Sequence, residues 1–277
     1  MIKFYSGNMM PKLGLGTFRM TDENNLKSII KEAYKTGYRH FDTAKMYQNE
    51  HIIGAALKEA NIDRSDIFIT TKIHFHDTKE NTYNKILDSL DKLQTDYIDL
   101  LLIHWPNHDD NINLRTWQVF EDAVKDGLVK NIGVSNFTRY QLTKLLEKAK
   151  IKPVVNQVEL HPGLSQEPLN SFLLENDIKI ISYGPLMKGR IFEDPYKSVL
   201  ENIALKYNAS IAQIVIAWGL SRDVIMIPKT SNITRLNENF NSKDIKLSDE
   251  DINTINKLNT GVRVYSDPSN NIYGKII

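Results

Sequence analysis

The chain alternates short apolar runs with longer stretches in which apolar residues recur every three or four positions. Short apolar runs are typical of buried strands, and the longer spacing is typical of helices with one buried face. Strands are predicted at residues 12–18, 39–44, 67–73, 97–105, 130–136, 154–160, 179–186 and 224–230. Helices are predicted at residues 24–36, 49–60, 79–93, 115–126, 139–149, 166–176, 197–220 and 232–239.

Eight strands, each followed by a helix, predict a (β/α)8 TIM barrel, an α/β fold formed by one domain over residues 1–277. The segment IKFYSGNMM before the first strand predicts a β-hairpin that caps the bottom of the barrel. Acidic residues after Ser248 predict an extra C-terminal helix, and residues 261–277 predict an irregular loop. A doubly wound sheet is the competing fold, but the GLGT run at 14–17 lacks the third glycine of its phosphate turn.

Composition narrows the classes of function. The net charge is +1 and the charged residues are interspersed, which argues against a nucleic-acid or anionic-membrane partner. The chain has no cysteine, so disulfides, thiolate catalysis and cysteine-ligated metals are excluded. No apolar run is long enough for a membrane span, and the N-terminus lacks the pattern of a secretory signal. We therefore expect a cytoplasmic protein.

Polar side chains end the predicted strands, at the face where a barrel of this kind carries its active site. Asp42 ends the second strand, and Tyr47 follows it closely. Lys72 ends the third strand and His104 the fourth. Asp42 alone is also typical of a turn cap, and His104 alone is also typical of a core histidine. Their convergence from successive strands favours catalysis over these structural roles.

Together the four side chains predict a general acid that faces a carbonyl group. Tyrosine has an ordinary pKa of about 10 and is a poor proton donor at neutral pH. Lys72 is expected to lower the pKa of Tyr47, and Asp42 is expected to keep Lys72 charged and oriented. His104 is expected to orient the carbonyl oxygen. Because the chain has no cysteine and no convincing metal cage, the reducing equivalent is expected from a bound cofactor.

Several motifs, in order along the chain, resemble signatures of the aldo-keto reductase family. GYRHFDTAKMYQNE (37–50) is similar to the family's aspartate signature, LLIHWP (101–106) to its histidine signature, and IPKTSNITRLNENF (227–240) to its C-terminal signature. GVSNF, NQVELHP and SYGPL also match in kind and order, and the chain is similar to bacterial members of the 2,5-diketo-gluconate reductase type. The resemblance implies a barrel that binds NADPH and reduces aldehydes and ketones, with Tyr47 as the proton donor.

The resemblance also assigns residues to the cofactor. Ser135, Asn136 and Gln157 are expected to hold the nicotinamide carboxamide, and Tyr183 is expected to stack on the ring. Basic side chains and free N–H groups at the helix start near Lys229 suit the adenosine 2′-phosphate, which favours NADPH over NADH. The other cofactor residues that the resemblance implies are Thr17, Asp42, Leu186, Gly189, Thr230, Ser231, Asn232, Arg235, Glu238 and Asn239.

The expected substrate walls are Phe18, Met46, Tyr47, His74, His104 and Trp105. Two residues depart from the family pattern: His74 stands where a tryptophan is common, and Gln48 where a glycine is common. A polar wall at His74 is expected to admit bulkier or more polar carbonyls, and Gln48 is expected at the pocket rim. No metal site is expected, because no carboxylate accompanies the histidines at 74, 76, 104 and 108.

The leading interpretation is an NADPH-dependent reductase of small carbonyl compounds that acts as a monomer. The first alternative is a non-catalytic, NADPH-binding regulatory subunit with the same barrel, and the intact set of four catalytic residues argues against it. The second is a barrel hydrolase or isomerase that uses Asp42 and Glu159 and needs no nicotinamide. Simple aldehydes, dicarbonyls and sugar-derived keto acids all remain candidate substrates.

Overall fold

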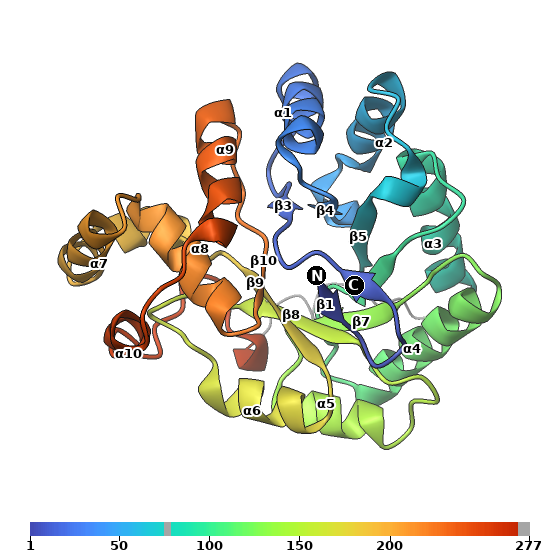
Figure 1. Cartoon of the computed structure of the whole chain (residues 1–277). Helices are drawn as coiled ribbons and strands as arrows, with labels where there is room; N and C mark the ends of the chain where they lie inside the picture. The colour runs from blue at the N-terminus through green and yellow to red at the C-terminus, as the bar shows by residue number, and fades with distance from the viewer. Residues whose placement is uncertain (75–78, 271–277) are drawn as a thin grey trace.

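A ring of strands is surrounded by helices in the computed structural model, which describes residues 1–74 and 79–270 (Figure 1). The strands are β1 Ile2–Lys3, β2 Met9–Met10, β3 Leu15–Gly16, β4 His40–Asp42, β5 Phe68–Ile73, β6 Leu100–Ile103, β7 Ile132–Ser135, β8 Val155–Glu159, β9 Lys179–Tyr183 and β10 Ile225–Met226. The helices are α1 Glu23–Thr36, α2 Glu50–Glu59, α3 Lys79–Leu93, α4 Asp110–Lys125, α5 Arg139–Leu146, α6 Glu167–Glu175, α7 Tyr196–Lys206, α8 Ile211–Ser221, α9 Ile233–Asn241 and α10 Asp249–Asn256.

The barrel is one curled parallel sheet whose two edges meet. Strands β3 to β10 pair in chain order, each parallel to the next. At the seam between β3 and β10, the Met226 N–H donates to the Lys12 carbonyl at 2.8 Å, and the Gly14 N–H donates to the Met226 carbonyl at 2.9 Å. The Gly16 N–H donates to the Pro228 carbonyl at 3.2 Å. The predicted (β/α)8 barrel is confirmed.

The glycines of the GLGT run serve close packing. A Cβ at Gly16 would lie 2.8 Å from the carbonyl oxygen of Ile227, across the seam. A Cβ at Gly14 would lie 2.1 Å from Nδ1 of the buried His40 ring. The run therefore brings β3 close to its neighbours, and it does not form the phosphate turn of a doubly wound sheet.

The N-terminal hairpin closes one end of the barrel, as predicted. β1 and β2 pair antiparallel through a turn with Gly7 at φ 91°, and the hairpin lies across the middle of the ring in Figure 1. Its buried residues Ile2, Phe4 and Met10 join an apolar cluster with Phe68, Leu100, Leu102, Val154, Val155, Ile181, Ile225 and Ile227. The hairpin thus fills the barrel from one end and leaves the carboxyl ends of the strands for a site.

Helix boundaries follow the capping residues. Asp22 accepts the Asn25 N–H at 2.8 Å to begin α1, and Gly37 ends that helix in the left-handed region at φ 115°. α4 begins at Asp110 rather than at residue 115. The prediction of one helix over 197–220 is wrong: α7 and α8 are separate and bent by 84°. Asn208 is left-handed at φ 48°, and Ser210 caps a new helix through a capping box with Gln213.

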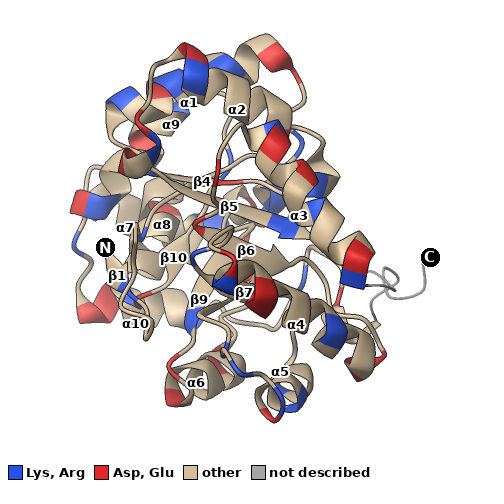
Figure 2. Ribbon diagram, turned by 90° about the vertical axis from the view of Figure 1, so that its right-hand side faces the viewer, with Lys and Arg blue, Asp and Glu red and all other residues tan. Residues whose placement is uncertain are grey.

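No single helix within the described ranges is long and apolar enough to cross a membrane; α7 and α8 pass that test only when joined across their bend. α8 is buried from Ile214 to Gly219 because it packs between the barrel and the outer helices. Figure 2 shows basic and acidic residues interspersed along the outer helices. This pattern agrees with the near-zero net charge of +1.

Candidate active site

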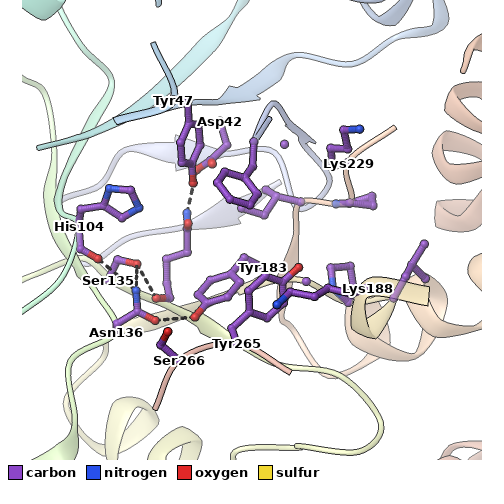
Figure 3. A pocket seen from close by; sticks show the side chains of 18 of the residues that line it. Asp42, Tyr47, His104, Ser135, Asn136, Tyr183, Lys188, Lys229, Tyr265 and Ser266 are labelled. Carbon is purple, nitrogen blue, oxygen red and sulfur yellow. Dashed lines mark hydrogen bonds between the residues drawn. The ribbon is translucent and has the colours of Figure 1, made fainter. Parts of the chain in front are cut away.

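A cavity of about 430 Å³ opens at the carboxyl ends of the strands. Figure 3 shows Asp42, Tyr47 and His104 toward one side of it, with Lys229 and Lys188 on the other. The predicted site residues that line it are Phe18, Asp42, Met46, Tyr47, His104, Trp105, Ser135, Asn136, Gln157, Tyr183, Leu186, Gly189, Lys229 and Arg235. Residues predicted from strand ends and from distant loops therefore share one cavity.

Asp42 and Lys72 form a buried ion pair. Asp42 ends β4 and Lys72 lies in the neighbouring β5, so their side chains meet on the inner side of the sheet. The Lys72 ammonium donates to Asp42 Oδ1 at 2.5 Å and to the Thr43 carbonyl at 2.7 Å. Gln157 Nε2 donates to Asp42 Oδ2 at 2.8 Å. These hydrogen bonds fix the orientation of both side chains.

The electrostatics of the pair follow from its burial. Burial raises the pKa of Asp42 and lowers the pKa of Lys72, because each charged form loses its hydration. The attraction between the two charges opposes both pKa shifts. Burial and pairing therefore act in opposite directions on each group, and the attraction between the two charges holds the side chains together.

Tyr47 is carried to the pair by η1, the 3-10 helix Lys45–Tyr47 that follows β4. Its ring centroid lies 5.1 Å from the Lys72 ammonium, 5.0 Å from the Phe18 ring and 5.6 Å from the His104 ring. Burial raises the pKa of Tyr47 well above its usual value, and the negative charge of Asp42 raises it further.

The pKa of Tyr47 is therefore raised, whereas the sequence predicted that Lys72 would lower it. The charge of Lys72 is balanced by Asp42 at 2.5 Å, so little net positive charge acts on the phenol, while burial penalises the tyrosinate. Tyr47 is consequently held as a neutral phenol, the form that can donate a proton to a carbonyl oxygen.

His104 follows β6, and its backbone N–H donates to the Ile73 carbonyl of β5 at 2.9 Å. Burial lowers the pKa of His104 well below its usual value, and the positive charge of Lys72 lowers it further. The imidazole is therefore neutral at physiological pH. Among the described residues, His104 Nδ1 has no hydrogen-bond partner, so the ring is oriented by packing against Tyr47 and His74.

A polar ring forms the cavity floor beside His104. Asn136 has a left-handed backbone at φ 63°, and its Nδ2 donates to the His104 carbonyl and to Ser135 Oγ, each at 3.1 Å. The Tyr183 hydroxyl donates to Asn136 Oδ1 at 2.7 Å, and the Ser135 hydroxyl donates to the Gln157 carbonyl at 2.9 Å. These contacts hold the aromatic face of Tyr183 and the amides of Asn136 and Gln157 in fixed positions (Figure 3).

The far side of the cavity is basic and lies at the start of α9. Lys229 and Arg235 line it. Asn232 caps the helix by accepting the Arg235 N–H at 3.0 Å, and the Thr230 hydroxyl accepts the Asn232 N–H at 3.1 Å. Two cationic side chains at a helix N-terminus fit a phosphate group.

Other predicted residues do not line the cavity. Thr17 is fully buried, and its hydroxyl donates to the Asp42 carbonyl at 2.9 Å. The His74 ring packs on His104 at 5.1 Å, outside the set of residues that line the cavity. Lys72, Thr230, Ser231, Asn232, Glu238 and Asn239 are likewise outside that set. Gln48 is exposed and does not form the rim.

Sequence reasoning missed a group of lining residues on two loops. Lys188 and Phe192 come from η3, Met187–Phe192, and Tyr265 and Ser266 come from the segment after α10. The basic residue in the PLMKGR run was a signal for Lys188. Tyr265 gave no signal, because it lies in a stretch without periodicity.

Metal chemistry was not predicted, and the histidine at position 76 lies outside the described residues. Over residues 1–74 and 79–270, no group of three or more His, Asp or Glu side chains is arranged to hold a metal ion. His161 instead lies 3.0 Å from Glu159, and His40 lies 3.0 Å from the Thr70 hydroxyl.

Comparison with known proteins identifies the family. The sequence model of the Aldo/keto reductase family matches residues 12–260. The chain belongs to the aldo/keto reductase family.

Individual relatives agree with this membership. A glyoxal reductase of Bacillus subtilis (strain 168) is 41% identical over 96% of this chain and 95% of its own length. The crystal structure of an aldo-keto reductase from a Medee basin deep-sea metagenome library is 39% identical, with a TM-score of 0.93 over 99% of this chain and 100% of that one. A Bombyx mori aldo-keto reductase in complex with NADP is 34% identical, with a TM-score of 0.88 over 96% of this chain and 94% of that one.

As an aldo/keto reductase, the chain is an oxidoreductase that acts on carbonyl groups with a nicotinamide cofactor. The hydrolase and isomerase alternative is excluded by this membership. The relatives give no support to the non-catalytic regulatory alternative.

Proposed function

We propose that this aldo/keto reductase reduces small aldehydes and dicarbonyl compounds to alcohols, with NADPH as the cofactor. The observation that carries the proposal is the buried Lys72–Asp42 pair beside Tyr47, at 2.5 Å between ammonium and carboxylate. A neutral phenol beside a buried lysine–carboxylate pair at the head of a cavity is an arrangement that can protonate a carbonyl oxygen.

Each of the four residues has a separate role in this proposal. Tyr47 donates its proton to the carbonyl oxygen, and the Lys72 ammonium, 5.1 Å from the ring, offsets the part of the burial cost of the tyrosinate that its pairing with Asp42 allows. Asp42 keeps Lys72 oriented through the 2.5 Å contact. The neutral His104 donates a hydrogen bond to the same carbonyl oxygen and so sets the direction of the substrate, because burial lowers its pKa and leaves it uncharged.

We assign the cofactor to the same cavity because residues at one end of the cavity suit its carboxamide and residues at the other end suit its 2′-phosphate. When bound, NADPH supplies the hydride for the carbonyl carbon. Ser135, Asn136 and Gln157 bind the carboxamide, and the face of Tyr183 packs on the ring that carries it. Lys229 and Arg235, with the start of α9, bind the 2′-phosphate, which only NADPH has.

The substrate side of the cavity supports a small carbonyl compound. Phe18 and Met46 are exposed at the opening, and Trp105 is buried beside His104. This apolar opening leads to a polar end at Tyr47 and His104, so it suits a compound with few carbons and a reactive carbonyl. The naming of a 41% identical relative as a glyoxal reductase supports dicarbonyls as the substrate class.

The proton donor is tested by Tyr47→Phe. We expect kcat for an activated aldehyde such as glyoxal to fall by roughly 10²- to 10⁴-fold, because a general acid contributes that much. NADPH binding, measured by quenching of tryptophan fluorescence, is expected to stay within about threefold of wild type. Tyr140→Phe, at an exposed tyrosine far from the cavity, is the matched control. Wild-type turnover by Tyr47→Phe would show that another group protonates the substrate.

The cofactor preference is tested by Lys229→Ala. We expect NADPH to bind about tenfold more weakly, because a charge-assisted contact to the 2′-phosphate is lost, and NADH to change by about twofold or less. Dissociation constants of both dinucleotides give the measurement. Lys243→Ala removes a positive charge from the far end of α9 and should change neither constant. Equal weakening of NADPH and NADH would remove Lys229 from the phosphate site.

A further inference from the structure

The segment after α10 crosses the top of the barrel and reaches the cavity. We call residues 259–266 the strap. It is tied to the loop after β8: the Thr260 and Val262 N–H groups donate to the Gly163 carbonyl at 3.3 and 3.1 Å, and Asn259 Oδ1 accepts the Ser165 N–H at 3.2 Å. Its last residues, Tyr265 and Ser266, line the cavity (Figure 3).

The strap is anchored by Glu159, the last residue of β8. Glu159 is fully buried, and its Oε1 accepts the Val264 N–H at 2.6 Å and the Tyr265 N–H at 3.3 Å. The same oxygen lies 3.0 Å from His161 Nε2, while Oε2 lies 3.7 Å from the Arg263 guanidinium. A buried carboxylate is costly unless it is paired, so this amount of pairing on one side chain points to a specific task.

The strap places the Tyr265 ring against Tyr183 in the cavity wall. The Tyr265 ring meets Tyr183 edge to face, with centroids 5.3 Å apart and an interplanar angle of 88°. Gly184 leaves room for this contact, since a Cβ there would lie 2.4 Å from the Tyr265 ring. Lys188, from the loop after β9, donates to the Val264 carbonyl at 2.5 Å, and its ammonium lies 4.2 Å from the Tyr265 ring centroid.

We propose that Glu159 is a positioning residue that slows cofactor dissociation by holding the strap. Through Tyr265 it fixes the ring of Tyr183 by an edge-to-face contact, and through the Lys188 contact it joins the loop after β9 to the strap. The cofactor leaves only when these contacts open, so the strength of the Glu159 anchor sets the rate of release. This inference rests on the proposed cofactor site.

The experiment measures NADPH dissociation by stopped-flow displacement with excess NADP⁺, following NADPH fluorescence. Glu159→Gln keeps the shape of the side chain and removes its charge, so the contacts to His161 and Arg263 weaken. We expect dissociation to become roughly tenfold faster, because charge-assisted hydrogen bonds are about twice as strong as neutral ones. The single-turnover rate of carbonyl reduction is expected to stay within about twofold, since Glu159 touches no reacting group.

A second pair of variants tests the route through the ring contact. Tyr265→Ala is expected to speed dissociation as Glu159→Gln does, and Tyr265→Phe, which keeps the ring edge, is expected to restore slow dissociation. The Glu159→Gln/Tyr265→Ala double variant is expected to be no faster than either single variant, because both break one chain of contacts. Tyr265→Ala also keeps the inference testable where Glu159→Gln folds poorly.

Asp251→Asn is the matched control. Asp251 is a buried carboxylate at the start of α10 that accepts from Lys206 at 2.6 Å and Tyr207 at 2.7 Å, away from the cavity. Its loss of charge should lower stability without changing dissociation. The same acceleration in Asp251→Asn, or an unchanged rate in both Glu159→Gln and Tyr265→Ala, would overturn the inference. A wild-type protein that binds no NADPH would instead overturn the proposed function itself.

Discussion

Gln48 carries a backbone conformation that suits glycine. It ends η1 at φ 56°, in the left-handed region, and its side chain is exposed. A side chain with a Cβ is strained there by about 1–2 kcal/mol, which explains why a glycine is common at this position in the family. The departure from the family pattern therefore concerns the backbone of the loop between Tyr47 and Asn49, and not the shape of the substrate pocket.

This interpretation predicts the effect of Gln48→Gly on stability. We expect the free energy of unfolding to rise by about 0.5 kcal/mol, because relief of strain exceeds the extra entropy of a glycine in the unfolded chain. Urea denaturation of the two proteins gives the measurement. The kcat/KM for glyoxal should stay within about twofold, since the Gln48 side chain does not line the cavity. A clear loss of stability would show that the Gln48 side chain makes a contact worth more than the strain.

The sequence predicted which residues lie at the strand ends, but it did not predict how their surroundings shift their pKa values. Asp42 ends β4, Lys72 is the penultimate residue of β5 and His104 directly follows β6, and parallel strands in a barrel bring such positions to one face. The direction of the Tyr47 pKa was not predictable, because it depends on how deeply the phenol is buried. Its burial depends on packing against rings such as Phe18 and His104, which are remote from Tyr47 in sequence.

At the level of elements, β3 and β10 are only two residues long each, yet they close the barrel. Gly16 lies where they meet, and a Cβ added there would lie 2.8 Å from the Ile227 carbonyl oxygen. The atom that an added methyl group would meet belongs to the backbone of Ile227, which cannot move aside as a flexible side chain can. A methyl group at Gly16 must therefore push the two strands apart.

Gly16→Ala is accordingly expected to lower the free energy of unfolding by about 2 kcal/mol or more, as overpacking at a rigid contact does. Chemical denaturation followed by far-UV circular dichroism gives the value. Gly127→Ala is a comparison from a surface turn where nothing lies within 4 Å, although its φ of 79° adds its own strain. Equal effects at the two positions would mean that strain at Gly127 matches the steric conflict at the seam.

Helix boundaries were predicted correctly where a capping residue or the end of a helical hydrophobic pattern marked them. α1 was predicted at both ends because Asp22 and Gly37 are unambiguous signals. The division between α7 and α8 was missed, since the apolar period continues across residues 207–210 and only the Ser210 capping box interrupts it. Residues 261–277 were expected to be an irregular loop, and the position of residues 261–266 at the cavity depends on contacts with Glu159 of β8 that the local sequence pattern does not predict.

For the whole molecule, buried histidines set the response to acid. Burial lowers the pKa of His40 to about 3, and its ring is fully enclosed beside Gly14. The unfolded chain binds a proton at His40 below its ordinary pKa of about 6.5, and the folded chain does so only below about 3. This contribution to stability is therefore complete above the unfolded pKa and is lost as the pH falls toward the folded pKa.

We expect each unit of pH between about 6.5 and 3 to remove about 1.4 kcal/mol of stability through His40, or about 2 kcal/mol by pH 5. His104 acts in the same direction, because burial lowers its pKa as well. Urea denaturation at pH 7.5, 6 and 5 measures the slope. His40→Gln removes the titrating group and should reduce that slope even if it lowers stability at every pH. An identical slope would assign the acid sensitivity to other groups.

The seam between β3 and β10 also determines when the protein can become a barrel during its synthesis. Gly16 is synthesised more than two hundred residues before Lys229, its bridge partner across the seam just after β10. Without this segment the sheet would have two unpaired edges, and the apolar cluster of the hairpin residues Ile2 and Phe4 would lack Ile225 and Ile227. Exposed strand edges are the surfaces on which chains pair wrongly with one another. The barrel therefore cannot close before residues 225–229 have been synthesised, and until then its strand edges are open to aggregation.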